Sequence, residues 1–464
     1  MSKTFQAGDP EKMLAILFNE ASPGDIIEIQ FKTGMPIGVS FFQGDPLNPV
    51  WIDGCDIAEF NSGLSIMDCH GLGFRSASIL NEINLNDSYP DVGIDGIYLS
   101  DLKQKGGSRG IFLGAYNAKR IFVDRCKFGY QVNGTHPIYM SGGHWTSHPE
   151  YYCEDIHITR STIQLNPCGR NGIQFNGRFK NCSVKNNLIR NFQLNAVDAT
   201  GVQGFEMSGN ICYGGNRGTG YVAYDYASHW APYYNYFQTE KDIEDFLATH
   251  WPNRDHRVFN NTIVVGPKAF SKGWGHKDDP TEGHPSVLIN NAVHSGFTFW
   301  NPDLGKYIDH PGIPFENKNL FVFDNILTAP STNLVDIYHA QEAKATHLIG
   351  NIFYSPKGPA PSTLEYAKSL GALIGNIFQD PGFVKWPDYP FIDLDANPGY
   401  NWKEFKVDAD LHSNLGAKLK KGAIRFPGKV FTGASTVLNP ELAAELLPDA
   451  LFRSLPKDAT PEVD

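Results

Sequence analysis

Three common features are missing from this 464-residue chain, and each absence excludes a class of protein. There is no lysine- or arginine-rich run, and 39 basic against 50 acidic side chains give a net charge of -11 at pH 7, so a nucleic-acid partner is not expected. No stretch approaches the roughly 20 apolar residues of a membrane-spanning helix, so no membrane partner is expected. The seven cysteines are odd in number and show no CxxC spacing, which favours free buried thiols over disulfides or a metal site.

The N-terminal segment does not show the charged, apolar and small-residue succession of a signal peptide. A secreted or periplasmic location is therefore expected only if such a peptide has been removed. Residues 9–21 instead predict a short helix, with Asp9 as the N-cap, Pro10 in the first turn and apolar residues at helical spacing. A helix with one polar face is a suitable cap for the first coil of a repeat protein.

Short strands built on one repeated phrase occupy most of the chain. The phrase starts with a small residue and continues with apolar, variable and apolar positions, as in 110–113, 172–175 and 220–223. A second strand then leads through a polar pivot into an apolar pair, and the shortest steps between pivots are 23 to 26 residues. The pivots are Cys126, Ser161, Asn187, Asn210, Asn261, Asn291, Asn325, Asn351 and Asn376. A period in this range indicates a repeat architecture with one supersecondary unit per period.

The predicted fold class is all-β, a right-handed parallel β-helix solenoid, because each repeat holds strands and no helical pattern. Stacked coils share one core that a single coil cannot form. Asparagine at the pivot is expected to take a left-handed conformation and to bond the asparagine of the next coil. We predict one domain, 1–464, made of an N-terminal cap (1–30), coils (31–223), an inserted loop and helix acting as a lid (224–256), more coils (257–378) and a C-terminal cap and tail (379–464).

One outward-facing strip is expected to run across the coils. Side chains along a strand point alternately to opposite faces, so the third and fifth positions of the phrase face outward. Aromatic, amide and carboxyl groups occupy these positions, and this composition suits a sugar-binding groove. The predicted strip is Tyr98, Ser100, Phe112, Tyr139, Ser141, Gln174, Asn176, Asp198, Thr200 and Tyr224.

Ionisable residues cluster on the strip and in the loops beside it, as is typical of active sites. The predicted catalytic residues are His136, Tyr139, Arg178, Asp198, Asp225 and His229. The predicted substrate-binding residues are Tyr98, His144, His148, Arg170, Gln174, Asn176, Tyr224 and Tyr226.

Two reactions use groups of this kind. In β-elimination from a uronic acid, a base removes the C5 proton, a neutraliser stabilises the carboxylate and an acid assists the leaving oxygen. His136 or Tyr139 would be the base or the acid, and Arg178 or Arg170 the neutraliser. In glycoside hydrolysis two carboxylates flank the bond. Asp198 and Asp225 form the best pair for that reaction, since they lie one coil apart in the predicted alignment.

No cofactor is expected. His144 and His148 would both ligate zinc only on a helix, whereas the residues between them indicate a loop. A calcium site formed by exposed acidic residues is left as an alternative, although the sequence shows no recognisable set of calcium ligands. The expected partner is a polysaccharide or oligosaccharide substrate, and a monomer or a homotrimer is expected.

The repeats at 95–378 resemble the right-handed parallel β-helix superfamily, which includes pectate-lyase-like polysaccharide lyases, glycoside hydrolases and phage tailspikes. The phrases HPIYMSG at 136–142 and NNLI at 186–189 carry this resemblance. It implies the fold and a carbohydrate-active enzyme, in first place a polysaccharide lyase acting on a uronic-acid polymer. A glycoside hydrolase and a non-catalytic carbohydrate-binding or phage receptor-binding protein are the alternatives.

Overall fold

The computed structural model describes the N-terminal half of the chain in most detail. The described residues are 2–89, 91–106, 109–129, 136–143, 151–165, 170–192, 194–214, 219–223, 255–259, 261–264 and 268–272, together with short strands between 286 and 430. The chain divides into two compact units. The first comprises Met1–Phe192, Val197–Glu206 and Tyr224–Asn253, and the second comprises Gln193–Ala196, Met207–Ala223 and Arg254–Asp464.

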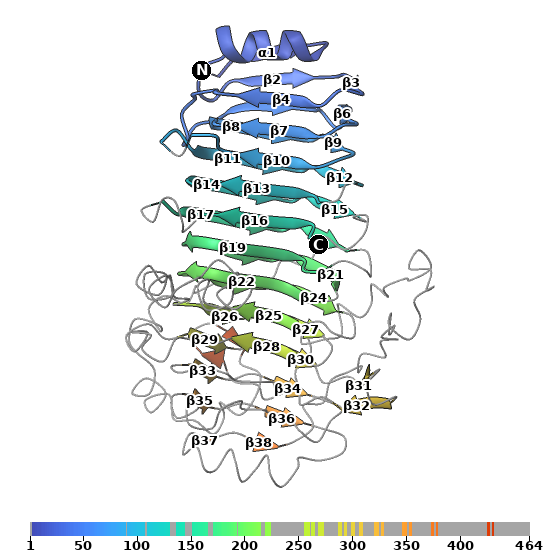
Figure 1. Ribbon diagram of the computed structural model, residues 1–464, viewed down its shortest axis with the longest axis vertical. Helices are drawn as coiled ribbons and strands as arrows, with labels where there is room; N and C mark the ends of the chain where they lie inside the picture. Colours follow the sequence, from blue (N-terminus) through green and yellow to red (C-terminus); the bar gives the residue numbers. More distant parts are fainter. Residues whose placement is uncertain are drawn as a thin grey trace, which may run out of the picture. The chain divides into compact units, whose positions relative to one another are not determined.

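A helix closes one end of the first unit, as predicted. Helix α1 (Pro10–Asn19) lies across the first strands in Figure 1. The Asp9 side chain caps it by accepting a hydrogen bond from the Lys12 N–H at 2.8 Å. Met13, Ile16 and Leu17 are buried against the coils, whereas most of the other helix residues are exposed. The helix therefore covers the apolar end of the core with a polar outer surface.

Three stacks of parallel strands form the coils of the first unit. The first stack contains β4 (Ile37–Ser40), β7 (Leu64–Met67), β10 (Ile83–Asn86), β13 (Ile111–Ala115), β16 (Ile138–Gly142), the start of β19 (Ile173–Lys180) and β22 (Asn195–Gln203) from Val197. The second contains β1 (Thr4–Ala7), β2 (Ile26–Ile29), β5 (Val50–Asp53), β8 (His70–Arg75), β11 (Ile94–Ser100), β14 (Ala118–Asp124), β17 (Cys153–Thr159) and β20 (Ser183–Lys185). The third contains β3 (Lys32–Thr33), β6 (Glu59–Phe60), β9 (Ser78–Ile79), β12 (Lys103–Lys105), β15 (Lys127–Gly129), β18 (Thr162–Gln164) and β21 (Leu188–Phe192).

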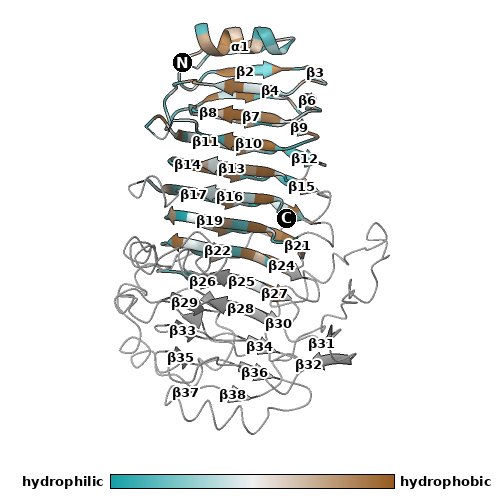
Figure 2. Cartoon of the chain, viewed as in Figure 1, coloured by the Kyte–Doolittle hydropathy of each residue, from teal (hydrophilic) through white to brown (hydrophobic). Residues whose placement is uncertain are grey.

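The apolar positions of the strands make one continuous core. Along β13, for example, Ile111, Leu113 and Ala115 are buried while Phe112 and Gly114 are half-buried. The same alternation recurs in β7, β10 and β16, and the apolar colouring in Figure 2 recurs from coil to coil. Because every coil contributes its inward residues to the same interior, the predicted parallel β-helix is confirmed.

The corner between the second and third stacks uses left-handed residues at a fixed place. The φ angles are 54° at Asp101, 50° at Arg125, 48° at Arg160 and 56° at Asn186. Arg125, Arg160 and Asn186 directly precede the pivots Cys126, Ser161 and Asn187, and Asp101 takes the same place before Leu102. The expectation that the pivot asparagine itself is left-handed is therefore wrong for the pivots that the structure describes. The turn needs one left-handed residue, and the side chain of the residue that follows it points into the core.

The predicted ladder of pivot side chains is present. Asn187 accepts a hydrogen bond from the Ser161 N–H at 2.9 Å through Oδ1 and donates to the Ile158 carbonyl at 2.9 Å through Nδ2. Ser161 accepts in turn from the Cys126 N–H at 3.1 Å. In the second unit Asn261 accepts from the Asn210 N–H at 2.9 Å. Each pivot thus satisfies a buried backbone group of the preceding coil.

The second unit also consists of parallel strands. One set pairs β24 (Ile211–Gly214), β27 (Thr262–Val264), β30 (Ala292–His294), β34 (Ile326–Thr328), β36 (Ile352–Tyr354) and β38 (Ile377–Phe378). Another pairs β26 (Arg257–Phe259), β29 (Ser286–Ile289), β33 (Leu320–Phe323), β35 (Thr346–Ile349) and β37 (Leu373–Ile374), and β25 (Thr219–Ala223) pairs with β28 (Lys268–Lys272). Two antiparallel pairs are β31 (Thr298–Asn301) with β32 (Lys306–Asp309) and β39 (Arg425–Phe426) with β40 (Lys429–Val430).

Several predicted parts fall outside the described residues. These are nearly all of the predicted lid at 224–256 and most of the tail at 379–464. The six cysteines that the structure describes are free, and five of them are buried. Within the described part of the chain, no helix is long and apolar enough to cross a bilayer.

Candidate functional site

The predicted strip is in register over four coils of the first stack. Phe112 of β13 lies opposite Tyr139 of β16, Tyr139 opposite Gln174 of β19, and Gln174 opposite Asp198 of β22. A second row runs parallel to it through Gly114, Ser141, Asn176 and Thr200. We call these eight residues the strip. Adjacent members are about 4.8 Å apart along the stack, the spacing of hydrogen-bonded strands.

Tyr98 does not belong to the strip, so its predicted position is wrong. It lies on β11 in the second stack, where its ring stacks on Phe122 at 4.9 Å and contacts Trp51 at 5.9 Å. Its hydroxyl donates a hydrogen bond to the Pro46 carbonyl at 2.9 Å. Ser100 follows it on the same strand and is also outside the strip.

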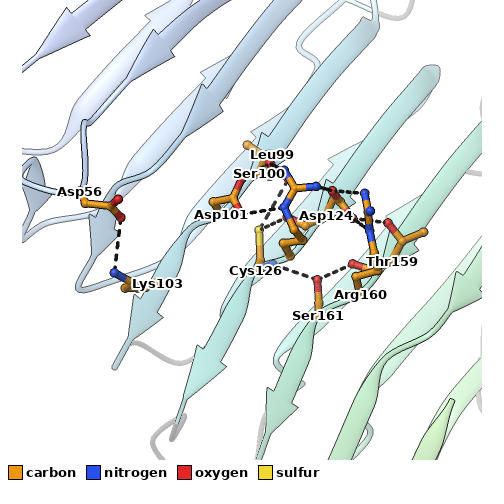
Figure 3. Close-up of polar contacts among 11 residues, drawn as sticks. Asp56, Leu99, Ser100, Asp101, Lys103, Asp124, Cys126, Thr159, Arg160 and Ser161 are labelled. Atoms are coloured by element: carbon orange, nitrogen blue, oxygen red, sulfur yellow. Dashed lines mark hydrogen bonds and ion pairs between the residues drawn. The ribbon is translucent and has the colours of Figure 1, made fainter. Parts of the chain in front are cut away.

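The outer side of the second stack neutralises its own charges. Arg160 and Asp124 approach to 2.6 Å beside Asp101, as Figure 3 shows, and Arg125 bonds Asp101 at 2.8 Å. Further along this stack Lys119 pairs with Glu154 at 3.1 Å. With its rings stacked on one another and its charges paired, this side fits a structural role.

Asp198 is the buried carboxyl group of the strip, with 6% of its surface exposed. Thr200 Oγ1 donates to its Oδ1 at 2.6 Å, and the side-chain amides of Asn171 and Gln174 donate to its Oδ2 at 3.2 and 3.3 Å. Burial raises the pKa of Asp198 from 3.8 to about 7, against the opposing effect of the hydrogen bonds from Thr200 and Asn171. A carboxyl group with this pKa can accept or donate a proton near neutral pH.

His136 is held as a neutral hydrogen-bond donor. Burial, assisted by the positive charges of Arg170 and Arg109, lowers the pKa of His136 to about 4. Its Nδ1 accepts the Asn171 main-chain N–H at 3.2 Å, so Nδ1 carries no proton and Nε2 carries the proton. In this tautomer Nε2–H is a hydrogen-bond donor, and the expected role of His136 as base or acid stays a prediction.

Tyr139 is fixed by contacts on its ring and its hydroxyl. Phe112 stacks on the ring at 5.9 Å and His136 at 5.3 Å, and the Arg109 guanidinium lies 5.4 Å from the ring centre. Asn176 Nδ2 donates to the hydroxyl oxygen at 2.9 Å, which leaves the hydroxyl proton available to a ligand. The rings contact each other, so the hydroxyl is the group that this residue offers to a substrate.

Three polar side chains precede the strip strands at one register position. Arg109, His136 and Asn171 each lie two residues before the first isoleucine of β13, β16 and β19, and those isoleucines are aligned. We call these three residues the strand-start row. Neither Arg109 nor Asn171 is among the predicted site residues. The signal for them was available, since both occupy the place of His136 in neighbouring repeats.

Arg178, one of the two predicted neutralisers, is buried in β19. It follows Gly177, whose φ is 148°, and only 2% of its surface is exposed. Its backbone and Cβ lie against Gly143, where an added Cβ would come within 2.8 Å of the Arg178 Cβ. Arg170, by contrast, is exposed at the strand-start side of the site.

Six predicted site residues lie outside the described residues, namely His144, His148, Tyr224, Asp225, Tyr226 and His229. The pairing of Asp198 with Asp225 and the spacing of the two histidines are therefore still predictions. Among the residues that the structure does describe, no three His, Cys, Asp or Glu side chains gather closely enough to hold a metal ion.

No protein-family model matches this chain, and no curated protein sequence matches it either. Solved structures with a similar fold include the PL6 family alginate lyase AlyGC, with 12% identity and a TM-score of 0.40 over 83% of this chain and 54% of that one. A mannuronic acid specific family 6 lyase from human gut microbiota has 11% identity and a TM-score of 0.37 over 82% and 92% of the chains. The GH136 lacto-N-biosidase from Eubacterium ramulus has 12% identity and a TM-score of 0.38 over 81% and 67%. The chain thus spans about half the length of AlyGC, and these likenesses concern the fold alone.

Proposed function

We propose that this protein is a carbohydrate-active enzyme that cleaves a uronic-acid-containing polysaccharide by β-elimination. The observation that carries the proposal is the convergence of Asp198 and the Tyr139 hydroxyl over β19, beside arginines that form no ion pair with a carboxylate of the described residues. A base, an acid and a cationic site for the substrate carboxylate are the three elements that the reaction needs.

Asp198 and Tyr139 reach β19 from opposite sides. Tyr139 belongs to the preceding coil, and its hydroxyl contacts Asn176 of β19. Asp198 belongs to the following coil, and its Oδ2 contacts Gln174 of β19 and Asn171 just before that strand. The two groups therefore bracket one position above β19, and this position is where we place the reacting sugar.

The charge around this position favours an anionic substrate. Neither Arg109 nor Arg170 forms an ion pair with any carboxylate of the described residues, although both act on His136. On the second stack, in contrast, Arg75 and Arg120 pair with Asp53 and Asp95. Arginine presents a planar fork of donors that matches a carboxylate. A uronic acid carboxylate would supply the missing counter-charge.

The groups divide the reaction as follows. Asp198 in its carboxylate form takes the C5 proton, the electron pair moves into a new C4–C5 double bond, and the C4–O bond breaks. The Tyr139 hydroxyl gives its proton to the departing oxygen. Arg109, Arg170 and the Nε2–H of His136 stabilise the negative charge that develops on the substrate carboxylate. The pKa of Asp198, about 7, suits a base that works near neutral pH.

Glycoside hydrolysis is the second candidate, because a carboxyl group with a raised pKa can also serve as a general acid. That reaction needs a second carboxylate across the bond. Among the described strip residues Asp198 is the one carboxylate, and its predicted partner Asp225 lies outside them. The described part of the site therefore favours elimination.

A screen of polyuronates and neutral polysaccharides tests the proposal. Ultraviolet absorbance of the unsaturated product is followed alongside the appearance of reducing ends. Elimination raises both signals, hydrolysis raises reducing ends alone, and binding without either signal would leave only a carbohydrate-binding role. Asp198→Asn and Tyr139→Phe should abolish the absorbance signal.

A matched pair of arginine variants tests the charge argument. Arg109→Gln should raise the KM for a polyuronate strongly, because it removes a cation from the strand-start row. Arg120→Gln removes a cation that is paired with Asp95 on the second stack, so it should leave the KM unchanged. Equal effects of the two substitutions would contradict a carboxylate-binding role for Arg109.

A further inference from the structure

Asn171 connects two residues of the site that belong to different coils. It lies two residues before Ile173 of β19, and 3% of its surface is exposed. His136 stands in the preceding coil and Asp198 in the following one. A residue at this place can act on both neighbours at once.

The main chain of Asn171 determines the hydrogen-bonding state of His136. Its N–H points at His136 Nδ1 over 3.2 Å, and a main-chain N–H can only donate. The proton of the neutral imidazole is therefore confined to Nε2. Arg109 and Arg170 are the charged groups that act on this histidine, and both favour its neutral form.

The side chain of Asn171 orients Asp198. Its Nδ2 donates to Asp198 Oδ2 at 3.2 Å, next to the 3.3 Å contact from Gln174, while Thr200 holds Oδ1. Asn171, Gln174 and Thr200 are uncharged, so the effect that opposes the rise in the Asp198 pKa on burial is hydrogen bonding. Two amides on one oxygen fix the plane of the carboxylate relative to β19.

We propose that Asn171 is a positioning residue that holds His136 and Asp198 in one working geometry, the first through its main-chain N–H and the second through its side-chain amide. The inference rests on the proposed function, in which both of those residues face the substrate. Gln174 shares the contact with Asp198 but has no bond to His136 in the structure, and it therefore serves as the internal comparison.

Replacing the Asn171 amide changes the pH dependence in a defined direction. Nδ2 stabilises the carboxylate form of Asp198, so Asn171→Ala should raise the pKa of that group further. Asn171→Asp keeps the shape of the side chain but places a second carboxylate beside Asp198, so it should raise the pKa of Asp198 by more than Asn171→Ala does. The rising limb of the kcat profile should move to higher pH in both variants, with kcat at neutral pH lower by about tenfold to hundredfold.

The experiment combines kinetics with two NMR titrations of the full chain. Carboxyl-labelled aspartate reports the ionisation of Asp198, assigned with Asp198→Asn, and labelled histidine nitrogens report the tautomer of His136. Gln174→Leu should move the Asp198 titration but leave the His136 signals unchanged. Asn171→Ala and Asn171→Asp keep the main-chain N–H, so they should move the Asp198 titration and leave the His136 tautomer unchanged. Asn171→Pro removes that N–H, so it should change the His136 nitrogen signals. Asn187→Ala, which removes an equally buried amide from the pivot ladder, should lower thermal stability and move neither titration.

The outcomes separate this inference from the proposed function. If no polysaccharide is cleaved, the proposed function fails, and the two titrations still decide the role of Asn171. If elimination is observed but Asn171→Ala titrates Asp198 like the wild type, or Asn171→Pro leaves the His136 tautomer unchanged, the positioning role is refuted. The isosteric Asn171→Asp variant keeps the test decisive where Asn171→Ala does not fold.

Discussion

Replacing Asp198 with asparagine should stabilise the first unit at alkaline pH while it abolishes catalysis. The pKa of Asp198 is raised from 3.8 to about 7, so the native state keeps a proton that the unfolded chain has lost over this interval. The free energy of unfolding must therefore fall as pH rises through that interval. At about 1.4 kcal/mol per pH unit, the loss amounts to at most about 4 kcal/mol above pH 7.

Asparagine avoids this loss because it cannot ionise, and the site can accept it. Its carbonyl oxygen can take the two amide donors of Asn171 and Gln174, and its amide can donate to the Thr200 hydroxyl, which is able to accept. Protonated Asp198 would make the same set of bonds. Wild type and Asp198→Asn should therefore be equally stable near pH 4, where Asp198 is protonated in the native state.

The assay is the urea midpoint of both proteins from about pH 4 to about pH 9, converted to free energy with a common slope. Asp25→Asn is the control, because the pKa of Asp25 is shifted in the opposite direction to that of Asp198. Hydrogen bonds from the Lys3 and Ser22 main chain lower the pKa of Asp25, so its stabilising effect is present at neutral pH and is lost on acidification. The asparagine variant at that position should be less stable at neutral pH, with a deficit that disappears in acid. A gain for Asp198→Asn that is the same at all pH values would refute the reasoning.

Three further predictions concern the scaffold. Asn187→Ala should cost about 2–6 kcal/mol in urea unfolding, because the Ser161 N–H and a buried carbonyl lose their partner at about 1–3 kcal/mol each. Gly177→Ala should reduce the yield of folded protein, since an added Cβ would lie 1.7 Å from the Gly142 carbonyl oxygen and the φ of 148° disfavours any side chain. Asp124→Asn should change the free energy of unfolding by less than about 1 kcal/mol, because its arginine partners are half-exposed and their ion pairs are screened.

Much of the fold could be predicted because the repeat has one period and one core. The cap helix followed from Asp9 and Pro10, and the alignment of Tyr139, Gln174 and Asp198 followed from the spacing of the repeated phrase. A register fixed by alternating burial leaves little freedom, since a shift by one residue would turn the apolar side chains outward.

The chemical state of the site could not be predicted, because it depends on contacts between coils. Asn171 and Arg109 stand before their strands, where the alternation of side-chain directions gives no guide and the repeat position that they share with His136 is the signal that marks them. The proton of His136 is placed by a main-chain N–H from the next coil. The raised pKa of Asp198 reflects burial, which a list of outward positions does not reveal.

The misplaced Tyr98 shows where repeat reasoning is ambiguous in a solenoid with more than one outward face. The segment Gly96-Ile97-Tyr98-Leu99 reads like Gly110-Ile111-Phe112-Leu113. Yet the two glycines meet different needs. Gly96 has a φ of 67° within β11, while Gly110 lies so close to the Pro137 carbonyl that an added Cβ would be 2.6 Å from its oxygen.

Glycine suits both positions, so the same sequence pattern occurs in β11 of the second stack and at the start of β13 in the first stack. Charge pairing separates the two faces where the phrase does not. The second stack pairs acids with bases of neighbouring coils, as in Arg120 with Asp95 and Lys119 with Glu154. The strip carries amides and one carboxyl group, with unpaired arginines at its edge among the described residues. An outward face with arginines unpaired among the described residues is the face that we propose to meet the substrate.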